Sequence, residues 1–460
     1  MAAFQPTPLH PFLNSFTELL DQRSAWRLEP LVKGMLFARG RQTVTSWLRA
    51  NQHADDFRQF YQFLATVGRS SQPLFAELQR QVFAQLPANG RLIISFDDSP
   101  TKRVGPKIQG ASFHHNPTPG PAGSDLLYGH NWVTTSYVAH HPQWGSISLP
   151  LAGKLYLSEK ARAPLDPELQ QQHPFRTKLK LATELLDELA PTLQEQDVPV
   201  WMVADGFYAK KEVVDKARAL GFTYVTRLRH DAALYEVPVE PQVKKRGRPR
   251  KYGDKIDLAK RAAHPQGWQF NDMTLYGQQQ TKQTKHFVAI HRTMGKILVV
   301  LVKEEHGWVA FACTKLDATP TEALTAYAER VGMEQNYRDL KEVDGWGEQQ
   351  VRRLDANLGC MTMTLIKHTL VELWAWNQSN QALKRRKKAS PWDDATRRPS
   401  HADRCQLLKG LILENELSQA CSKQSISRKI KNLFKTLSRY WVSLNYRFFQ
   451  LAPPDSICGR

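Results

Sequence analysis

Apolar residues change their spacing near Arg91, and the change divides the chain into two kinds of structure. Residues 1–88 carry apolar side chains at helical intervals and no clear strand pattern. The chain then carries short apolar runs such as Leu92-Ile-Ile-Ser-Phe96, which are typical of strands buried on both faces. We therefore predict a helical N-terminal domain over residues 1–88, followed by a domain of strands and helices.

The order of the later runs predicts an α/β fold, a mixed sheet flanked by helices. The strand-like runs cover residues 92–96, 132–138, 146–151, 198–204 and 222–228. Helical spacing covers residues 177–190 and 210–220. Pairing the first three strands would give an antiparallel meander, and the helix, strand, helix and strand that follow complete an RNase H-like order. We place the first part of this domain at residues 89–228.

Two aspartates directly follow apolar strands. Asp97 follows residues 92–96, and Asp205 follows residues 198–204. Open α/β sheets place their chemistry at the carboxyl ends of strands, so both acids are candidate site residues. An aspartate at such a position can also cap a helix or form a turn. Asp98 is an alternative to Asp97, because strand alternation does not separate the two.

Residues 320–341 predict one helix with a charged face. Pro320 stands where helices tend to begin. At about 100° per residue, four polar side chains share an arc of about 60° along about 21 Å of helix axis. They are Tyr327, Arg330, Glu334 and Lys341. One acid among cations and a phenol suits a metal ion beside phosphates, although a solvated charged face has the same pattern.

The spacing Tyr-x2-Arg-x3-Glu-x6-Lys resembles the signature helix of one large branch of bacterial insertion-sequence transposases. These are DDE enzymes whose RNase H-like catalytic domain carries a β-rich insertion. The resemblance implies that Glu334 is the last of three metal-binding acids, with Asp97 and Asp205 upstream. Asp97 is preferred to Asp98 because these families show an acid, any residue and then Ser or Thr, as in Asp97-Asp98-Ser99.

The resemblance also implies residues that contact DNA. Tyr327, Arg330 and Lys341 match positions that hold phosphates at the element end. Arg338 falls on the same helix face, and we add it on geometry alone. Trp308 stands where some relatives place a tryptophan that stacks on an unpaired base, although a buried strand aromatic would look the same.

Three carboxylates without histidine or cysteine suit a two-metal phosphoryl-transfer site. Two divalent ions can activate the attacking oxygen, stabilise the leaving oxygen and neutralise developing charge. Hard oxygen ligands favour Mg²⁺ or Mn²⁺. We therefore predict a DNA transposase that cuts double-stranded DNA at its element's ends and joins the 3′ hydroxyls to target DNA. The resemblance further implies a hairpin intermediate and a homodimer on DNA.

Two other functions stay open at this point. One is another RNase H-like nuclease, such as a junction resolvase, against which the signature spacing and the chain length argue. The other is a DNA-binding regulator derived from an inactive transposase. The presence of all three acids argues against that loss of catalysis without excluding it.

A basic, strand-rich segment interrupts the predicted catalytic domain at residues 229–303. Its strand-like runs cover residues 268–275, 286–291 and 297–302. The sequence Arg246-Gly-Arg-Pro-Arg250 resembles an AT-hook, whose arginines enter a narrow minor groove. Arg246, Arg248 and Arg250 are therefore candidate DNA contacts, with a solvated basic linker as the alternative. The catalytic domain resumes at residues 304–353, and residues 354–460 form a helical, basic C-terminal region.

Residues 41–49 resemble the second helix of a helix-turn-helix, with Gly40 at the turn. The pattern predicts DNA contact by the N-terminal domain. Many three-helix bundles share the pattern without binding DNA.

The composition agrees with a nucleic-acid partner. Lys plus Arg number 63 against 44 acids, a formal charge of +19, which favours nucleic acid or an anionic membrane surface. The sequence has no apolar run of about 18 residues and no signal-peptide pattern at its N-terminus. We expect a cytoplasmic, nucleoid-associated protein with no membrane contact and no small-molecule substrate. Five scattered cysteines without a Cys-x-x-Cys pair argue against disulfides and zinc.

Overall fold

The computed structural model describes residues 7–86, 90–116, 123–238, 250–384, 394 and 396–422. Internal contacts divide the chain into two compact units. Unit 1 comprises Met1–Gln85, Thr101–His130 and Tyr337–Arg460, and unit 2 comprises Leu86–Pro100 and Asn131–Asn336.

Unit 2 is built on a mixed sheet. The first strands of this sheet are β1 (Leu92–Lys102), β3 (Leu126–His141), β4 (Gly145–Tyr156), β5 (Val200–Ala204) and β6 (Thr223–Leu228). The last residues of β1 and the first residues of β3 belong to unit 1. The strands lie in the order β4-β3-β1-β5-β6. Strand β5 is parallel to both β1 and β6, whereas β3 and β4 are antiparallel. This arrangement is RNase H-like, and the predicted fold class is confirmed.

Helices cover this sheet because apolar residues alternate to both faces of its central strands. The helices of unit 2 are α7 (Glu159–Arg162), α8 (Pro167–Gln172), α9 (Lys178–Gln194), α10 (Lys211–Ala219), α11 (Leu258–Ala263) and α12 (Pro320–Ala328). Trp201 and Val203 of β5 pack into one buried cluster with Ala323 and Leu324 of α12. A capping box begins α12, in which the Thr319 hydroxyl accepts from the Glu322 backbone N–H at 3.1 Å.

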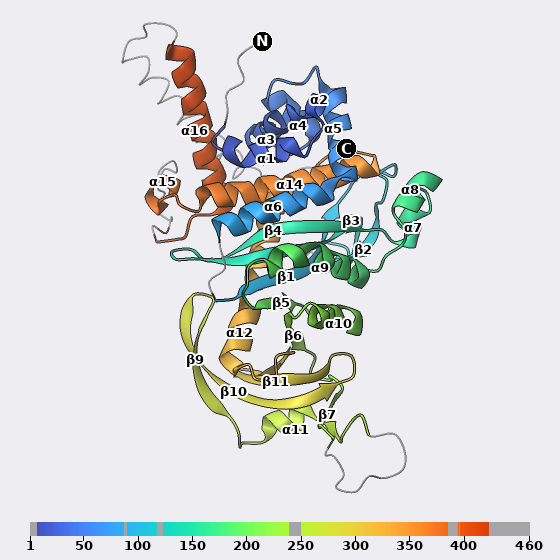
Figure 1. Ribbon diagram of the computed structural model, residues 1–460, viewed down its shortest axis with the longest axis vertical. Coiled ribbons are helices and arrows are strands. Elements are labelled where there is room, and N and C mark those ends of the chain that lie inside the picture. Colours follow the sequence, from blue (N-terminus) through green and yellow to red (C-terminus); the bar gives the residue numbers. More distant parts are fainter. Residues whose placement is uncertain are drawn as a thin grey trace. The chain divides into compact units, whose positions relative to one another are not determined.

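The predicted insertion continues the same sheet. Its strands are β7 (Leu234–Tyr235), β8 (Lys255–Ile256), β9 (Gln269–Leu275), β10 (Gln278–His291) and β11 (Gly295–Glu304). Strand β12 (Gly307–Cys313) joins β11 to β6, giving the order β6-β12-β11-β10. Both β9 and β7 also pair with β10, and Figure 1 shows β10 and β11 as a long, curved hairpin. The three strand-like runs predicted in the insertion are therefore confirmed.

The sequence pattern predicted that the first strand ends before Asp97, and this prediction is wrong. Strand β1 runs on to Lys102, although its pairing with β5 ends where Phe96 lies opposite Ala204. Its other neighbour, β3, is much longer than β5, and the backbone of β1 therefore stays in the sheet beyond the acids.

The single helix predicted over residues 320–341 is also wrong, because the stretch forms two helices. α12 ends at Ala328, and α13 covers Val331–Glu342. Between them, Arg330 N–H donates to the Tyr327 carbonyl oxygen at 3.1 Å, a tight turn rather than an α-helical bond. Val331 and Gly332 are weak helix formers, which favours the break. The arc calculated for one straight helix therefore does not hold.

Unit 1 is mainly helical. It contains α1 (His10–Glu18), α2 (Gln22–Ala25), α3 (Leu28–Phe37), α4 (Val44–Ala50), α5 (Phe57–Arg69), α6 (Ser71–Gln85), α14 (Leu354–Ala375), α15 (Asn380–Lys384) and α16 (His401–Ser422). A short strand, β2 (Ser112–His115), pairs with the first residues of β3. The central helix is α14, which lies along α5 and α6 (Figure 1).

Two glycines let α5 and α14 touch through their backbones. A Cβ atom at Gly68 would lie 1.9 Å from the Asp355 carbonyl oxygen, and one at Gly359 would lie 1.8 Å from the Leu64 carbonyl oxygen. This close approach buries α14 on almost every side, which explains its apolar sequence. Among the described residues, the helices are all too short or too polar to cross a membrane.

The predicted helix at residues 41–49 is present as α4. Gly40 adopts a positive φ of 62° at the turn after α3, and Thr43 caps α4 in a capping box with Ser46. Trp47 is fully buried. DNA contact by this helix stays a prediction.

Candidate active site

Strand register places Asp97 and Asp205 side by side in unit 2. Each acid follows the last residue of the paired segment, in which Phe96 lies opposite Ala204. Neighbouring strands lie about 4.8 Å apart, so the two carboxyl groups start from adjacent backbones. The Asp205 carboxylate accepts from the Phe207 backbone N–H at 2.9 Å, and the Asp97 carboxylate accepts from the Asp98 N–H at 2.9 Å.

The surroundings of Asp97 disfavour a second negative charge. Burial, together with the nearby charge of Asp205, raises the pKa of Asp97 to about 6, although the Arg330 guanidinium opposes the rise. Two close carboxylates with restricted access to water create a demand for positive charge. A divalent cation with hard oxygen ligands would meet that demand, so the residues present fit Mg²⁺ or Mn²⁺.

Arg330 connects the predicted first and third acids. Its Nη2 donates to Asp97 Oδ2 at 2.6 Å, and its Nη1 donates to Glu334 Oε1 at 3.0 Å. Burial would lower the pKa of Arg330, but Asp97 and the other acids raise it overall. Arg330 occupies the turn between α12 and α13, and Glu334 lies in the first turn of α13 with an exposed side chain. The helix break therefore places one guanidinium between carboxylates from β1 and α13.

Asp98 has different partners from Asp97. Lys178 Nζ donates to Asp98 Oδ2 at 2.6 Å, and the Tyr208 hydroxyl donates to Asp98 Oδ1 at 3.2 Å. Asp98 is thus held toward α9, whereas Asp97 meets Arg330.

Two predicted aromatic residues lie along neighbouring elements of unit 2. Tyr327, in the last turn of α12, packs against Phe311 with ring centroids 4.9 Å apart, and burial raises its pKa. Trp308 stacks on His230, with centroids 4.4 Å apart and ring planes 21° from parallel. Ala310 lies opposite Leu228, the last residue of β6, so Trp308 lies beyond the carboxyl end of β6. Asp205 follows the carboxyl end of the parallel strand β5, so both residues lie at the same end of the strands.

The remaining predicted site residues fall in three places. Arg338 and Lys341 lie on the part of α13 that belongs to unit 1, where Arg338 is exposed and burial lowers the pKa of Lys341. Arg250 is exposed, 3.7 Å from Asp254. Arg246 and Arg248 lie outside the described residues. The same is true of two basic segments of the predicted C-terminal region, most of the run Lys384-Arg-Arg-Lys-Lys388 and all of residues 428–439.

Comparison with known families gives the class of this protein. Residues 11–292 match the family described as DDE superfamily endonuclease, and the chain belongs to this family. The matched segment contains Asp97 and Asp205 and ends before Glu334. Membership supports a nuclease-type function on DNA with divalent metal ions. The search of curated proteins finds no match.

A buried ionic cluster in unit 1 escaped the sequence analysis. Asp344, His368 and His401 offer ligand atoms within 4.8 Å of one another and could hold a metal ion. The ammonium of Lys367 already contacts the Asp344 carboxylate and lies 3.7 Å from the Cys405 sulfur. Since a cation of the protein itself compensates Asp344, we interpret this group as a structural ion cluster. Cysteine spacing could not predict this cluster, because its three candidate ligands are one aspartate and two histidines.

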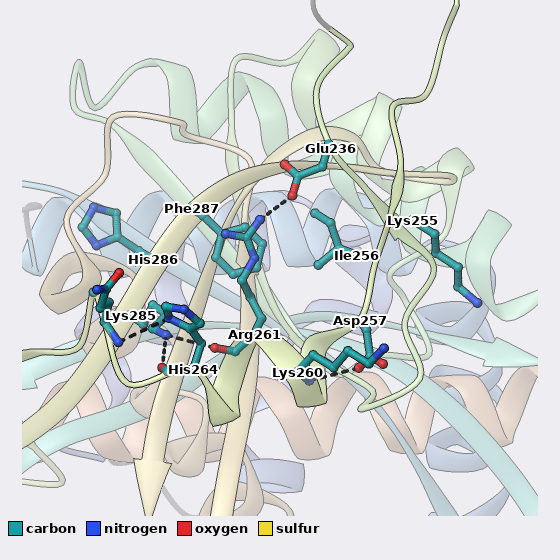
Figure 2. Close-up of a pocket in the computed structure, with 12 residues that line it drawn as sticks. Glu236, Lys255, Ile256, Asp257, Lys260, Arg261, His264, Lys285, His286 and Phe287 are labelled. Carbon is teal, nitrogen blue, oxygen red and sulfur yellow. Dashed lines mark hydrogen bonds and ion pairs between the residues drawn. The ribbon is translucent and has the colours of Figure 1, made fainter.

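The insertion contains a basic pocket of about 570 Å³. Figure 2 shows Arg261 reaching Glu236, and the Lys285 ammonium lying against the backbone of Arg261 and His264. Lys285 Nζ donates to these two carbonyl oxygens at 2.9 and 2.6 Å. Arg261 and Lys285, two of the four Lys and Arg residues that line the pocket, are thus bonded within the protein, and we assign the pocket no ligand.

The basic segment at residues 246–250 carries a testable prediction. Replacing Arg246, Arg248 and Arg250 with Ala should weaken DNA binding and lower the salt slope by up to about 0.9 per lost phosphate contact. The matched control replaces the same three residues with Lys, which keeps the charge but loses the arginine preference for narrow A·T-rich grooves. Titrations at several salt concentrations measure both effects. An unchanged affinity and slope would assign the segment to a solvated linker.

Proposed function

We propose that this chain is a DNA transposase of an insertion sequence, which cuts at its element's ends and joins the 3′ hydroxyls to target DNA. The observation that carries the proposal is the link made by Arg330 between Asp97 and Glu334, with Asp205 beside Asp97. Asp97 and Asp205 directly follow adjacent paired segments of an RNase H-like sheet, in a member of a DDE endonuclease family.

In this proposal the carboxylates of Asp97, Asp205 and Glu334 hold two divalent ions, Mg²⁺ or Mn²⁺. Such ions, when bound, supply activation of the attacking oxygen and stabilisation of the leaving oxygen. The Arg330 guanidinium bonds to both Asp97 of β1 and Glu334 of α13, and so keeps these two carboxylates close together.

We assign the DNA contacts to further side chains of the signature spacing and its surroundings in the sequence. Tyr327, Arg330 and Lys341 hold phosphates of the element end, and Arg338 is a fourth candidate contact. Trp308 stacks on an unpaired base, and the acting form is a homodimer on DNA in the bacterial cytoplasm.

A cleavage assay on supercoiled DNA that carries the element ends tests the function. A transposase produces cuts at the ends and products joined to target DNA. Another RNase H-like nuclease produces cuts without joining, and an inactive derivative binds the ends without cutting. The last two outcomes would each replace the proposal with the corresponding alternative.

Metal rescue separates the acids from the phosphate-binding residues. Glu334→Asp keeps the charge but retracts the carboxylate, so cleavage should fall in Mg²⁺ and recover in part in Mn²⁺, which tolerates distorted coordination better. Arg330→Ala should slow cleavage through misaligned acids and weaker end binding, and Mn²⁺ should not restore it. Rates in the two metals, with DNA affinity measured in parallel, give the comparison. Rescue of Arg330→Ala alone would mean that these two roles are reversed.

A further inference from the structure

Phe207 is an exposed aromatic residue directly beside the candidate acids, and the proposed mechanism gives it no role. Its side chain is 46% exposed, although it lies only two residues after Asp205. Its backbone N–H donates to the Asp205 carboxylate at 2.9 Å. The loop that orients this acid therefore also presents a hydrophobic ring to solvent.

The ring of Phe207 is held between Tyr208, in the loop after β5, and Lys178, the first residue of α9. It meets Tyr208 edge-on, with centroids 5.1 Å apart and ring planes at 86°. Tyr208 is fully buried, and its hydroxyl donates to Asp98. The Lys178 ammonium lies 5.7 Å from the Phe207 ring centroid and is anchored by the same Asp98. Phe207 is thus a fixed platform with a cation near its face.

The chemistry of this platform fits an unpaired nucleobase. A flat, exposed ring flanked by a cation offers stacking to any base, since every base has a π-face. Bases in an intact duplex already stack on their neighbours, and their faces are unavailable to a side chain. The ring therefore suits a base that has left the duplex, and its position two residues from Asp205 places that base near the reacting phosphate.

We propose that Phe207 stacks on an unpaired DNA base adjacent to the phosphate that is cut, and so positions the strand at the acids. This inference rests on the proposed function. It predicts a contact between one side chain and one base, which a paired change in protein and DNA can isolate.

The test combines Phe207→Ala with DNA that lacks a single base. Element-end substrates carry one abasic position each, a few nucleotides to either side of the cut, and cleavage is followed in single turnover with enzyme in excess. Phe207→Ala should slow cleavage of intact DNA about 5- to 150-fold, the loss of one stacked base. One abasic substrate should slow the wild-type protein similarly, and combining the two changes should cause no further loss.

Two variants control for structure and chemistry. Phe207→Trp keeps an aromatic face and should retain most activity. Phe270→Ala removes another aromatic ring, 76% exposed in the insertion, and should cut at the wild-type rate. Cleavage by Phe207→Ala at the wild-type rate would overturn the inference while the proposed function stands. The same conclusion would follow if the effects of Phe207→Ala and of base removal on the cleavage rate multiplied at every abasic position. A wild-type protein that makes no metal-dependent cut would instead overturn the proposed function.

Discussion

Asp97→Asn, Asp205→Asn and Glu334→Gln should each lower DNA cleavage about a thousand-fold or more, while binding to the element ends stays nearly intact. Each change keeps the shape of the side chain and removes one negative charge that the metal ions require, an effect of several kcal/mol on the transition state. Cleavage of DNA carrying the ends, with affinity measured by titration, separates the two effects. Loss of binding in step with cleavage would point to misfolding or to a DNA-binding role for these acids.

Asp98→Asn is the matched control, since it makes the same change at the next residue. Asp98 bonds to Lys178 and Tyr208 rather than to Arg330, so its replacement should have a milder effect. An inactive Asp98→Asn beside an active Asp97→Asn would reverse the assignment of the first acid.

The strands and helices of unit 2 were predictable because their cause is local. Apolar runs and helical spacing reflect burial of each element, and they located all of the first five predicted strands. The predictions failed where contacts with residues far apart in the sequence determine the structure. Strand β1 passes Asp97 because its neighbour β3 continues, and no feature of residues 92–102 shows that. The turn at Arg330 breaks a stretch whose charge spacing resembles one helix.

The candidate site was only partly visible in the sequence for the same reason. Residue type and position after strands indicate Asp97 and Asp205 as candidate acids, and a family spacing indicates Glu334. The bond from Arg330 to Asp97 joins residues far apart in the chain, and it depends on how α12 packs against the sheet. Phe207 resembles any loop aromatic until its exposure and its fixed neighbours are known.

The ion cluster of unit 1 is the clearest case of a feature that only the fold creates. His368 Nδ1 lies 2.6 Å from Asp344 Oδ2, and His401 Nε2 lies 3.2 Å from Asp344 Oδ1. Burial would raise the pKa of Asp344, but Lys367 and the two histidines hold it well below its ordinary value. A second acid, Glu372, pairs with His401 and Arg404 in the same way. The cluster joins α14, α16 and the residues after α13 within one unit.

Breaking this cluster should strongly destabilise unit 1. Asp344→Asn keeps the shape but leaves Lys367 as a buried, uncompensated charge, which should cost about 3–5 kcal/mol in the free energy of unfolding. Arg80→Gln, which removes a largely exposed partner of Glu77 in the same unit, should cost less than about 1 kcal/mol. Urea denaturation of the wild type and both variants measures the difference.

The pH dependence of that difference tests its electrostatic origin. The folded-state pKa of Asp344 is lowered, so its stabilisation is present above the ordinary aspartate pKa of about 3.9 and is lost as the pH falls below it. The gap in stability between the wild type and Asp344→Asn should therefore be large at neutral pH and shrink in acid. In acid, protonation makes the wild-type side chain neutral, like that of asparagine. A gap that stays constant through this range would assign the effect to packing rather than to the charge of Asp344.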